Sequence, residues 1–318
     1  MKFRKLGIGI ASLNRVFLFA LLFISNISLS ISQDCKCNYI TDYYPYVYNA
    51  EIKYLNNEYD EAYSLLNIAA TNCGLLNQPD ILESIIFAEL SARKQLFNQA
   101  FEYLEKVLEN GFNYSYLENN PNLKSLQSHP QWGELRENVL KYEKHFDSMV
   151  NHTLRRKVID LIKKDQSLRF VDNKNKEEYK KMKEQDSINF IQIKNIFEMY
   201  GYPNTSLIGY SNLDENTDIM FMLMHFNDTL YIKPKLLEFI RKGECSPYVL
   251  GYFVDSNDRG KGMFTYGVYQ NIDSTKIKDY KSIDIRRESI GLRSYEAEKQ
   301  KNNLIQDLIE KYRKNKIN

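Results

Sequence analysis

The sequence predicts a mainly α-helical protein with a helical-repeat N-terminal domain and an α+β C-terminal domain that contains one β-hairpin. Two similar helix–turn–helix segments indicate the first domain, and apolar stripes at helical spacing indicate helices in the second. One stretch rich in aromatic and β-branched residues predicts the hairpin. The two domains span residues 33–144 and 145–296, between a signal peptide at 1–32 and a polar C-terminal helix or tail at 297–318.

The first 32 residues have the composition of a secretory signal peptide. A basic start precedes the 12-residue apolar run "VFLFALLFISNI", and Ser30 and Ser32 supply the small residues that a signal peptidase reads. Cleavage is therefore predicted before Gln33. The run is shorter than the roughly 20 residues that cross a bilayer. We expect export to the periplasm or cell exterior without stable membrane insertion, and an uncleaved N-terminal anchor is the alternative.

Charge and motif content narrow the classes of partner. The chain carries a formal charge of +2, and removal of residues 1–32, with four basic and no acidic residues, leaves −2. Such a chain has no overall basic field for nucleic acid. His129, His145 and His152 are not grouped at metal-ligand spacing, and no phosphate-binding glycine loop or catalytic elbow motif is present. No nucleic acid, metal or cofactor is expected.

All four cysteines follow the predicted cleavage site, in a compartment that permits disulfides if export is right. Cys73 is expected to bridge to Cys35 or Cys37, which ties the N-terminus to the end of a nearby helix and stabilises the fold by about 2–4 kcal/mol. A Cys35–Cys37 bridge is geometrically tight. Cys245 is either the remaining partner or a free thiol.

The N-terminal domain contains two segments that align at a constant offset of 38 residues, "NAEIKYLNNEYDEAYSLLNIAATNCG" and "AELSARKQLFNQAFEYLEKVLENG". Each predicts a helix, a tight polar turn and a second helix, with Ala62 and Ala100 where the helices approach most closely. The pattern resembles the tetratricopeptide repeat, whose usual period is about 34 residues. Two repeats bury little alone, so the segment from Tyr116 to Tyr142, with short helices interrupted by Pro121 and Pro130, is expected to cap them.

The C-terminal domain is expected to begin with amphipathic helices over "HFDSMVNHTLRRKVIDLIKKDQSLRF" and "SINFIQIKNIFEMYGYP". Gly201 suits the left-handed position past the second helix. A solvated, charge-dense stretch from Val171 to Asp186 separates the two. The stretch "SPYVLGYFVDSNDRGKGMFTYGVYQNI" predicts the β-hairpin, with its turn at "SNDRGKG".

Residues 145–296 resemble a bacterial family, the domain of unknown function 6624. The landmarks are "KKDQSLRF", "DSINFIQIKNIFEMYGYP", "MHFND" and "FVDSNDRGKGMFTYGVY" followed by "IRRESIGL", in that order. The chain departs from the polar pattern of that family at Met224, Ser256, Phe264, Val268 and Tyr269. If the polar set forms a family active site, the resemblance implies that this copy has lost much of it.

The landmarks supply the candidate catalytic residues His225, Asp165, Arg169, Arg287 and Tyr266. His225, within "FMLMHFND", is either a packed core or boundary histidine or a general acid or base, because an imidazole titrates near neutral pH. Asp165 and Arg169, four residues apart, form either a helix-surface ion pair or part of a site. Tyr266, before Gly267, is expected at a strand position where the backbone approaches closely.

Two further landmark positions have structural alternatives. Asp186 suits the N-cap of the following helix. Arg286 and Arg287 either clamp an anion or anchor the terminal helix.

Two functions follow from the whole chain. The first is an exported, non-catalytic scaffold or binding protein that offers a helical-repeat groove to a protein or peptide partner. The alternative is a hydrolase-like or small-ligand-binding C-terminal domain centred on His225.

Overall fold

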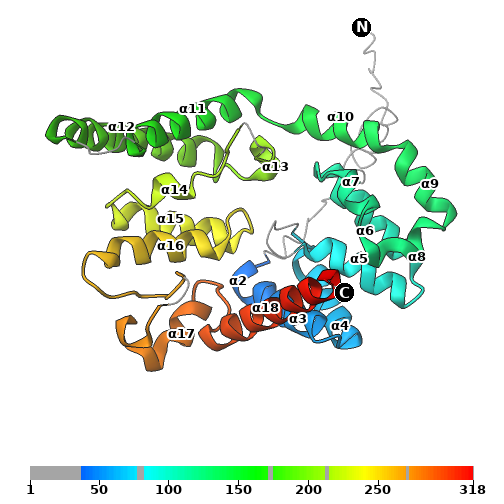
Figure 1. Ribbon diagram of the computed structural model, residues 1–318. Coiled ribbons are helices and arrows are strands. Elements are labelled where there is room, and N and C mark those ends of the chain that lie inside the picture. The colour runs from blue at the N-terminus through cyan, green and yellow to red at the C-terminus, as the bar shows by residue number, and fades with distance from the viewer. Residues whose placement is uncertain (1–36, 77–81, 171–174, 212–214, 270–271, 318) are drawn as a thin grey trace, which may run out of the picture. The chain divides into compact units, whose positions relative to one another are not determined.

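The computed structural model describes residues 37–317 except 77–81, 171–174, 212–214 and 270–271, and the predicted signal peptide lies outside the described residues. A short helix, α2 (Tyr39–Asp42), precedes two helical hairpins. The first hairpin joins α3 (Tyr44–Leu55) to α4 (Tyr59–Cys73), and the second joins α5 (Glu83–Arg93) to α6 (Phe97–Glu109) (Figure 1).

The two hairpins turn in the same way. Asn57 and Gln95 occupy equivalent places and both adopt a left-handed backbone, with φ of 62° and 61°. The Asn57 amide donates to the Tyr54 carbonyl, and the Gln95 amide donates to Ala92 in the same register. The small residues predicted at the closest helix approach, Ala62 and Ala100, are fully buried.

Short helices follow the second hairpin, as expected for the segment from Tyr116 to Tyr142. These are α7 (Tyr114–Glu118), η1 (Pro121–Leu123), α8 (Lys124–Gln127), α9 (Pro130–Glu137) and α10 (Val139–Met149). His129 is the N-cap of α9, with Pro130 in the first turn. Trp132 and Leu135 of α9 share one hydrophobic cluster with α5 and α6, so this segment covers the second hairpin.

The C-terminal half stacks further helices. α11 (His152–Arg169) packs beside α12 (Lys176–Tyr200), α13 (Thr205–Ile208) contacts α11, and α14 (Met220–Leu223) contacts α12 (Figure 1). α16 (Pro247–Arg259) packs on α14 and on α15 (Thr229–Arg241). The chain ends with η2 (Ser274–Lys276), η3 (Tyr280–Ser282), α17 (Ile283–Glu288) and α18 (Tyr295–Ile317). Gly201 ends α12 with φ of 79°, as predicted.

The predicted β-hairpin is wrong, because the described residues contain no strand and only one isolated bridge, between Phe264 and Ile277. Its first arm is α16. Ser246 caps that helix by accepting from the Tyr248 amide, and Pro247 stands in the first turn, where a missing N–H costs nothing. This start signal outweighs the β propensity of the aromatic residues that follow. The C-terminal part is therefore helical with long loops, not α+β.

The boundary predicted at residues 144 and 145 stays a prediction, and the main hydrophobic cluster contains residues from both sides of it. Tyr44 and Leu66 belong to the same cluster as Ile196, Leu236 and Leu250. The first turns of α18 also contact α3. Among the described residues, no helix combines the length and apolarity needed to cross a membrane.

Cys37 and Cys73 lie at disulfide distance, with Cα atoms 5.3 Å apart. This selects Cys37 between the two predicted partners of Cys73, and Cys35 lies outside the described residues. Cys245 is a buried free thiol, and burial raises the pKa of that thiol.

Candidate functional site

Asp165 of α11 is the centre of a buried polar group that we call the helix-pair cluster, made of Asp165, Arg169, Asp186 and Asn189. Arg169 donates to both Asp165 oxygens, from Nε at 2.9 Å and Nη2 at 2.8 Å, and Asn189 of α12 donates at 3.2 Å. Arg169 also pairs with Asp186 across the two helices. Asp165 is 2 % exposed. The contacts therefore lock α11 to α12.

Two structural interpretations from the sequence are corrected here. Asp165 and Arg169 do not form a helix-surface pair, because their side chains are 1 % and 15 % exposed. Asp186 does not cap a helix, because α12 already begins after Asn175, which forms a capping box with Glu178. The charge-dense stretch holds a better N-cap than Asp186, so the helix starts eleven residues earlier.

His225 follows α14 and is half-buried beside this cluster. Burial lowers the pKa of its imidazole, and the positive charge of Arg169 lowers it further, while Asp165 and Asp186 oppose the change. The pKa of the Arg169 guanidinium shifts in the opposite direction to that of His225. Burial disfavours its charge, but the two carboxylates outweigh that effect and raise the pKa of Arg169. His225 is therefore a neutral imidazole next to an ion-paired group.

Asp255 and Arg287 form a second group, which we call the loop cluster, together with Tyr266 and Glu298. Asp255 of α16 is fully buried and accepts three main-chain N–H groups, from Thr265 and Tyr266 at 2.8 Å and from Val268 at 2.9 Å. Burial raises the pKa of Asp255 despite these donors. The carboxylate thus holds the loop that the sequence analysis assigned to a strand.

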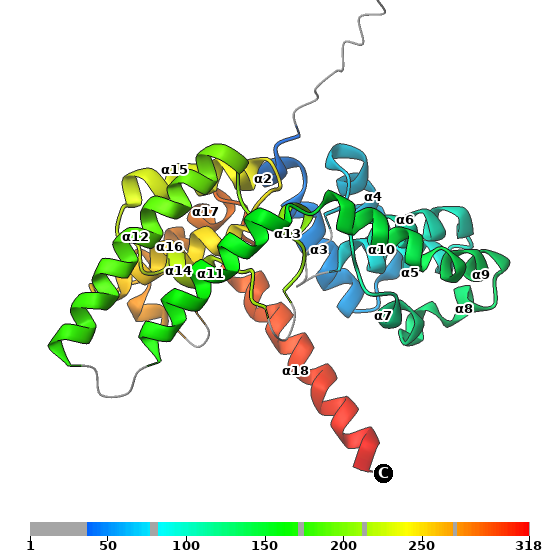
Figure 2. The same ribbon diagram turned by 90° about the horizontal axis from the view of Figure 1, so that it is seen from above.

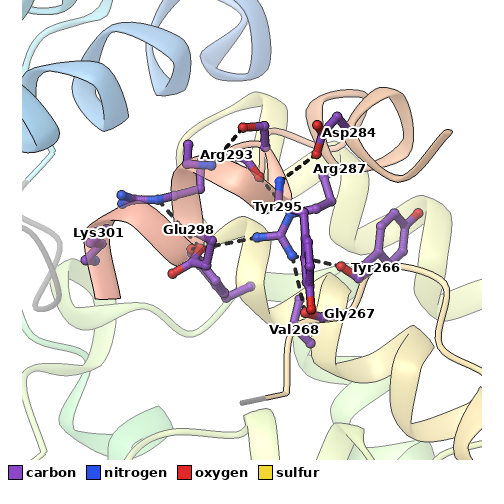
Figure 3. Close-up of polar contacts among 12 residues, drawn as sticks. Tyr266, Gly267, Val268, Asp284, Arg287, Arg293, Tyr295, Glu298 and Lys301 are labelled. Atoms are coloured by element: carbon purple, nitrogen blue, oxygen red, sulfur yellow. Dashed lines mark hydrogen bonds and ion pairs between the residues drawn. The ribbon is translucent and has the colours of Figure 1, made fainter. Parts of the chain in front are cut away.

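Arg287 holds the same loop from its carbonyl side. Its Nη1 donates to the Tyr266 carbonyl at 2.8 Å, and its Nε donates to the Arg293 carbonyl at 2.7 Å. Figure 3 shows the guanidinium between this loop and Glu298, to which Nη2 donates at 3.2 Å. Arg287 is fully buried. Every one of these partners belongs to the chain, so Arg287 is an anchor in this structure.

The loop cluster continues to the first hairpin. Arg293 pairs with Glu51 of α3, and Lys301 of α18 lies 3.0 Å from the same carboxylate. Burial disfavours the charge of Arg293, but Glu51 and Glu298 raise its pKa. The guanidinium also lies over the Tyr48 ring, 4.4 Å from its centroid. These contacts fix the start of α18 on α3.

The predicted site residues therefore separate into two groups. His225 lies with Asp165 and Arg169, whereas Arg287 and Tyr266 belong to the loop cluster. Tyr266 is 4 % exposed, and burial raises the pKa of its phenol. Sequence reasoning singled out Asn189 as a landmark without assigning it a contact, and it missed the other partners that complete the two groups, Glu51, Glu298 and Arg293. The described residues contain no group of three side chains arranged to hold a metal ion.

Four of the positions at which the chain departs from the family pattern lie together, and one of them, Met224, precedes His225 in the sequence. The Ser256 hydroxyl donates to the Met224 carbonyl at 2.8 Å, and the Tyr269 hydroxyl lies 3.7 Å from the Met224 sulfur. The rings of Phe264 and Tyr269 are 5.8 Å apart. These contacts link the four substituted positions into one group that includes Met224, the residue before His225.

No protein-family model matches the chain, and comparisons with curated proteins and with solved structures find no match either. The resemblance of residues 145–296 to the domain of unknown function 6624 therefore stays a prediction, as does the resemblance of the hairpins to tetratricopeptide repeats.

Proposed function

We propose that the protein is an exported, non-catalytic binding protein whose stacked helical hairpins present a surface to a protein or peptide partner. The observation that carries this proposal is the equivalence of the hairpins α3–α4 and α5–α6. They share their turn conformation and buried alanines at an offset of 38 residues. Helical repeats of this kind stack into extended surfaces that bind other chains.

The exposed sides of α4 and α6 are the surface that we assign to the partner. The first helices of the hairpins are covered by the chain itself, since α18 packs on α3 and nine of the eleven residues of α5 are buried. By contrast, Ile68 of α4 is 40 % exposed, and Glu102 and Glu105 of α6 face solvent. A partner would match this surface with an apolar side chain at Ile68 and a basic one at Glu105, because Glu102 is already paired with Lys106.

The engaged state of the candidate catalytic groups supports a non-catalytic role. Asp165 accepts hydrogen bonds from side chains of the chain, and Arg287 donates to a main-chain carbonyl and to Glu298. The packed set at Met224, Ser256, Phe264 and Tyr269 stands where the resemblance expects polar groups. Export is supported by the signal-like N-terminus and by Cys37 and Cys73 at disulfide distance.

Export is tested by fractionating cells and sequencing the N-terminus of the protein. We expect a chain that begins at Gln33 and that contains one disulfide between Cys37 and Cys73. A full-length chain in the membrane fraction, with both thiols reduced, would reject export.

Partner binding is tested with a photo-crosslinking residue placed at Ile68 or Glu105, and at Lys261 as an exposed control beyond α16. We expect one discrete adduct from the first two positions and none from the control. The captured protein, once purified, should bind the wild type at least tenfold more tightly than the Ile68→Glu variant. Equal adducts at all three positions, or unchanged binding by the variant, would reject the surface.

A second candidate function rests on the helix-pair cluster, because it places an imidazole beside Arg169, Asp165 and Asp186. In this alternative, the C-terminal part binds or hydrolyses a small molecule through His225. Ester, amide and phosphate substrates tested with wild type and His225→Ala would distinguish the two. Turnover that disappears in the variant would establish the alternative and contradict the non-catalytic proposal.

A further inference from the structure

In the part of the chain that the structure describes, polar contacts fix α18 at its start. Glu298 pairs with Arg287, and Lys301 pairs with Glu51 of α3. Among the described residues, no hydrogen bond or ion pair reaches α18 beyond Lys301. Figure 2 shows the distal half of the helix extending away from the other helices. The ion pairs at its base give this half a defined direction.

The distal half carries an apolar stripe that the described residues leave partly open. Leu304, Ile305, Leu308 and Ile309 fall within an arc of about 140° at 3.6 residues per turn. Leu308 is 48 % exposed and Ile309 is 38 % exposed. A helical segment of this length is marginal in water when nothing packs against it. The stripe therefore requires a covering surface.

The charged residues around the stripe indicate the chemistry of that surface. Lys311 lies about 20° beyond one edge of the apolar arc and Arg313 about 40° beyond the other, and both are exposed. Asp307 lies about 60° and Glu310 about 100° beyond the arc. Cations at such margins can lay their stems along an apolar layer while their charges reach an anionic one. The helix dipole also favours cations at this end, and of the charged residues from 307 to 314, Lys311 and Arg313 lie closest to the two edges of the arc.

A second copy of the chain is a poor fit for the stripe. Stable protein pairs bury roughly 1,200–2,000 Å² in total. Four partly exposed aliphatic side chains from each copy offer far less than this area. A lipid surface has no such threshold, because each side chain partitions on its own and basic residues add attraction to anionic headgroups.

We propose that the distal half of α18 docks on an anionic lipid membrane, with Leu304, Ile305, Leu308 and Ile309 in the acyl boundary and Lys311 and Arg313 at the headgroups. The helix lies on the membrane surface and does not span it. This membrane contact is separate from the partner surface on α4 and α6, and it holds whether or not that surface binds a protein.

Vesicle co-sedimentation tests the proposal with the purified full chain. The vesicles are phosphatidylcholine alone or an equimolar mixture of phosphatidylcholine and phosphatidylglycerol. We expect at least tenfold stronger binding to the mixture, reduced by high salt. The double variant Leu308→Glu, Ile309→Glu should lose this binding. The matched double variant Asn303→Glu, Gln306→Glu adds the same charge on the polar side of the helix and should keep most of it.

Three results would overturn the proposal. The first is no binding of the wild type to the anionic vesicles at low salt, and the second is an equal loss in both double variants. The third is a dimer in sedimentation velocity that disappears with Leu308→Glu, Ile309→Glu while vesicle binding is absent. Thermal unfolding of the variants provides the folding check, because the substituted positions lie beyond Lys301, the last residue of α18 with an ion pair to the rest of the described chain.

Discussion

The helix-pair cluster and the loop cluster both hold segments of the C-terminal part together, but they differ in how far their side chains are exposed to solvent. In the loop cluster, Arg287 is fully buried, and both carboxylate oxygens of Asp255 accept hydrogen bonds from main-chain N–H groups. In the helix-pair cluster, Arg169 and Asp186 keep some exposure, and His225 stands half-buried beside them. Asp255 and Arg287 are engaged by the chain and hold the fold, although Arg293 beside them keeps Nε and Nη1 buried without a hydrogen-bond partner among the described residues. The partly open helix-pair cluster retains a group that can exchange a proton with solvent.

This difference matters because both clusters contain the residue types of an active site. Buried carboxylates, guanidinium groups and shifted pKa values mark catalytic centres, and they mark structural ion pairs equally well. What separates the two cases is whether donors and acceptors remain for a ligand. By that criterion, Asp255 and Arg287 are anchors, and among the predicted site residues the remaining candidate chemistry is at His225.

The largest expected effect is the loss of Arg287. The substitution Arg287→Met removes the donors to the Tyr266 and Arg293 carbonyls and leaves Glu298 without this partner. Truncating one member of a buried, hydrogen-bonded pair costs about 3–5 kcal/mol. Urea unfolding monitored by circular dichroism measures the loss.

Arg286→Met is the matched control for that measurement. Arg286 is the neighbouring residue and also donates to main-chain carbonyls, including Thr265 at 3.0 Å, but its side chain is 22 % exposed. We expect a loss of about 1 kcal/mol, the usual value for partly solvated hydrogen bonds. Similar losses for the two variants would mean that the loop cluster is no more essential than the surface around it.

Local sequence patterns predicted much of the helical architecture, but they do not show which residues far apart in the sequence form ion pairs. The offset between Ala62 and Ala100 and the breaker at Gly201 are visible in the sequence, and the structure contains both features. The error at α16 arose because β propensity was weighed above the Ser246 and Pro247 start signal. Even a correct helix assignment would not have joined Arg293 to Glu51, which are 242 residues apart.

The site was harder to predict than the fold for a related reason. A spacing of four residues suggested that Asp165 and Arg169 pair, and they do. Burial of the pair depends on Asn189 and Asp186 from the next helix, which the single-helix pattern does not contain. Likewise, Tyr266 and Arg287 contact each other in the loop cluster and do not belong to the group around His225. The sequence pattern does not separate these two groups, because the separation depends on tertiary contacts.

An intermediate effect is expected within the helix-pair cluster itself. Asp165→Asn removes a buried charge from Arg169 and should cost about 2 kcal/mol, since hydrogen bonds to charged groups contribute about 1.5–3 kcal/mol. Asp186→Asn changes a carboxylate that is 21 % exposed. Its loss should stay below about 1 kcal/mol, as for other partly exposed ion pairs. Chemical denaturation of the two variants side by side makes the comparison, and the reverse order would show that Asp186 is the principal partner of Arg169.

The smallest effect concerns the pH dependence of stability through His225. Because the folded environment lowers its pKa, the unfolded chain binds this proton more readily below the ordinary value of about 6.5. Stability therefore falls as the pH drops from that value toward the folded pKa. His225→Gln cannot take up the proton, so its unfolding midpoint should decline less between neutral pH and about pH 5 than that of the wild type.

NMR titration of the His225 ring measures its pKa directly. A ring that titrates above about 6.5 would mean that Asp165 and Asp186 dominate over burial and Arg169. Only a ring whose pKa lies above neutral pH would be an imidazolium under neutral conditions, and that result would supply the general acid that the hydrolase-like alternative requires.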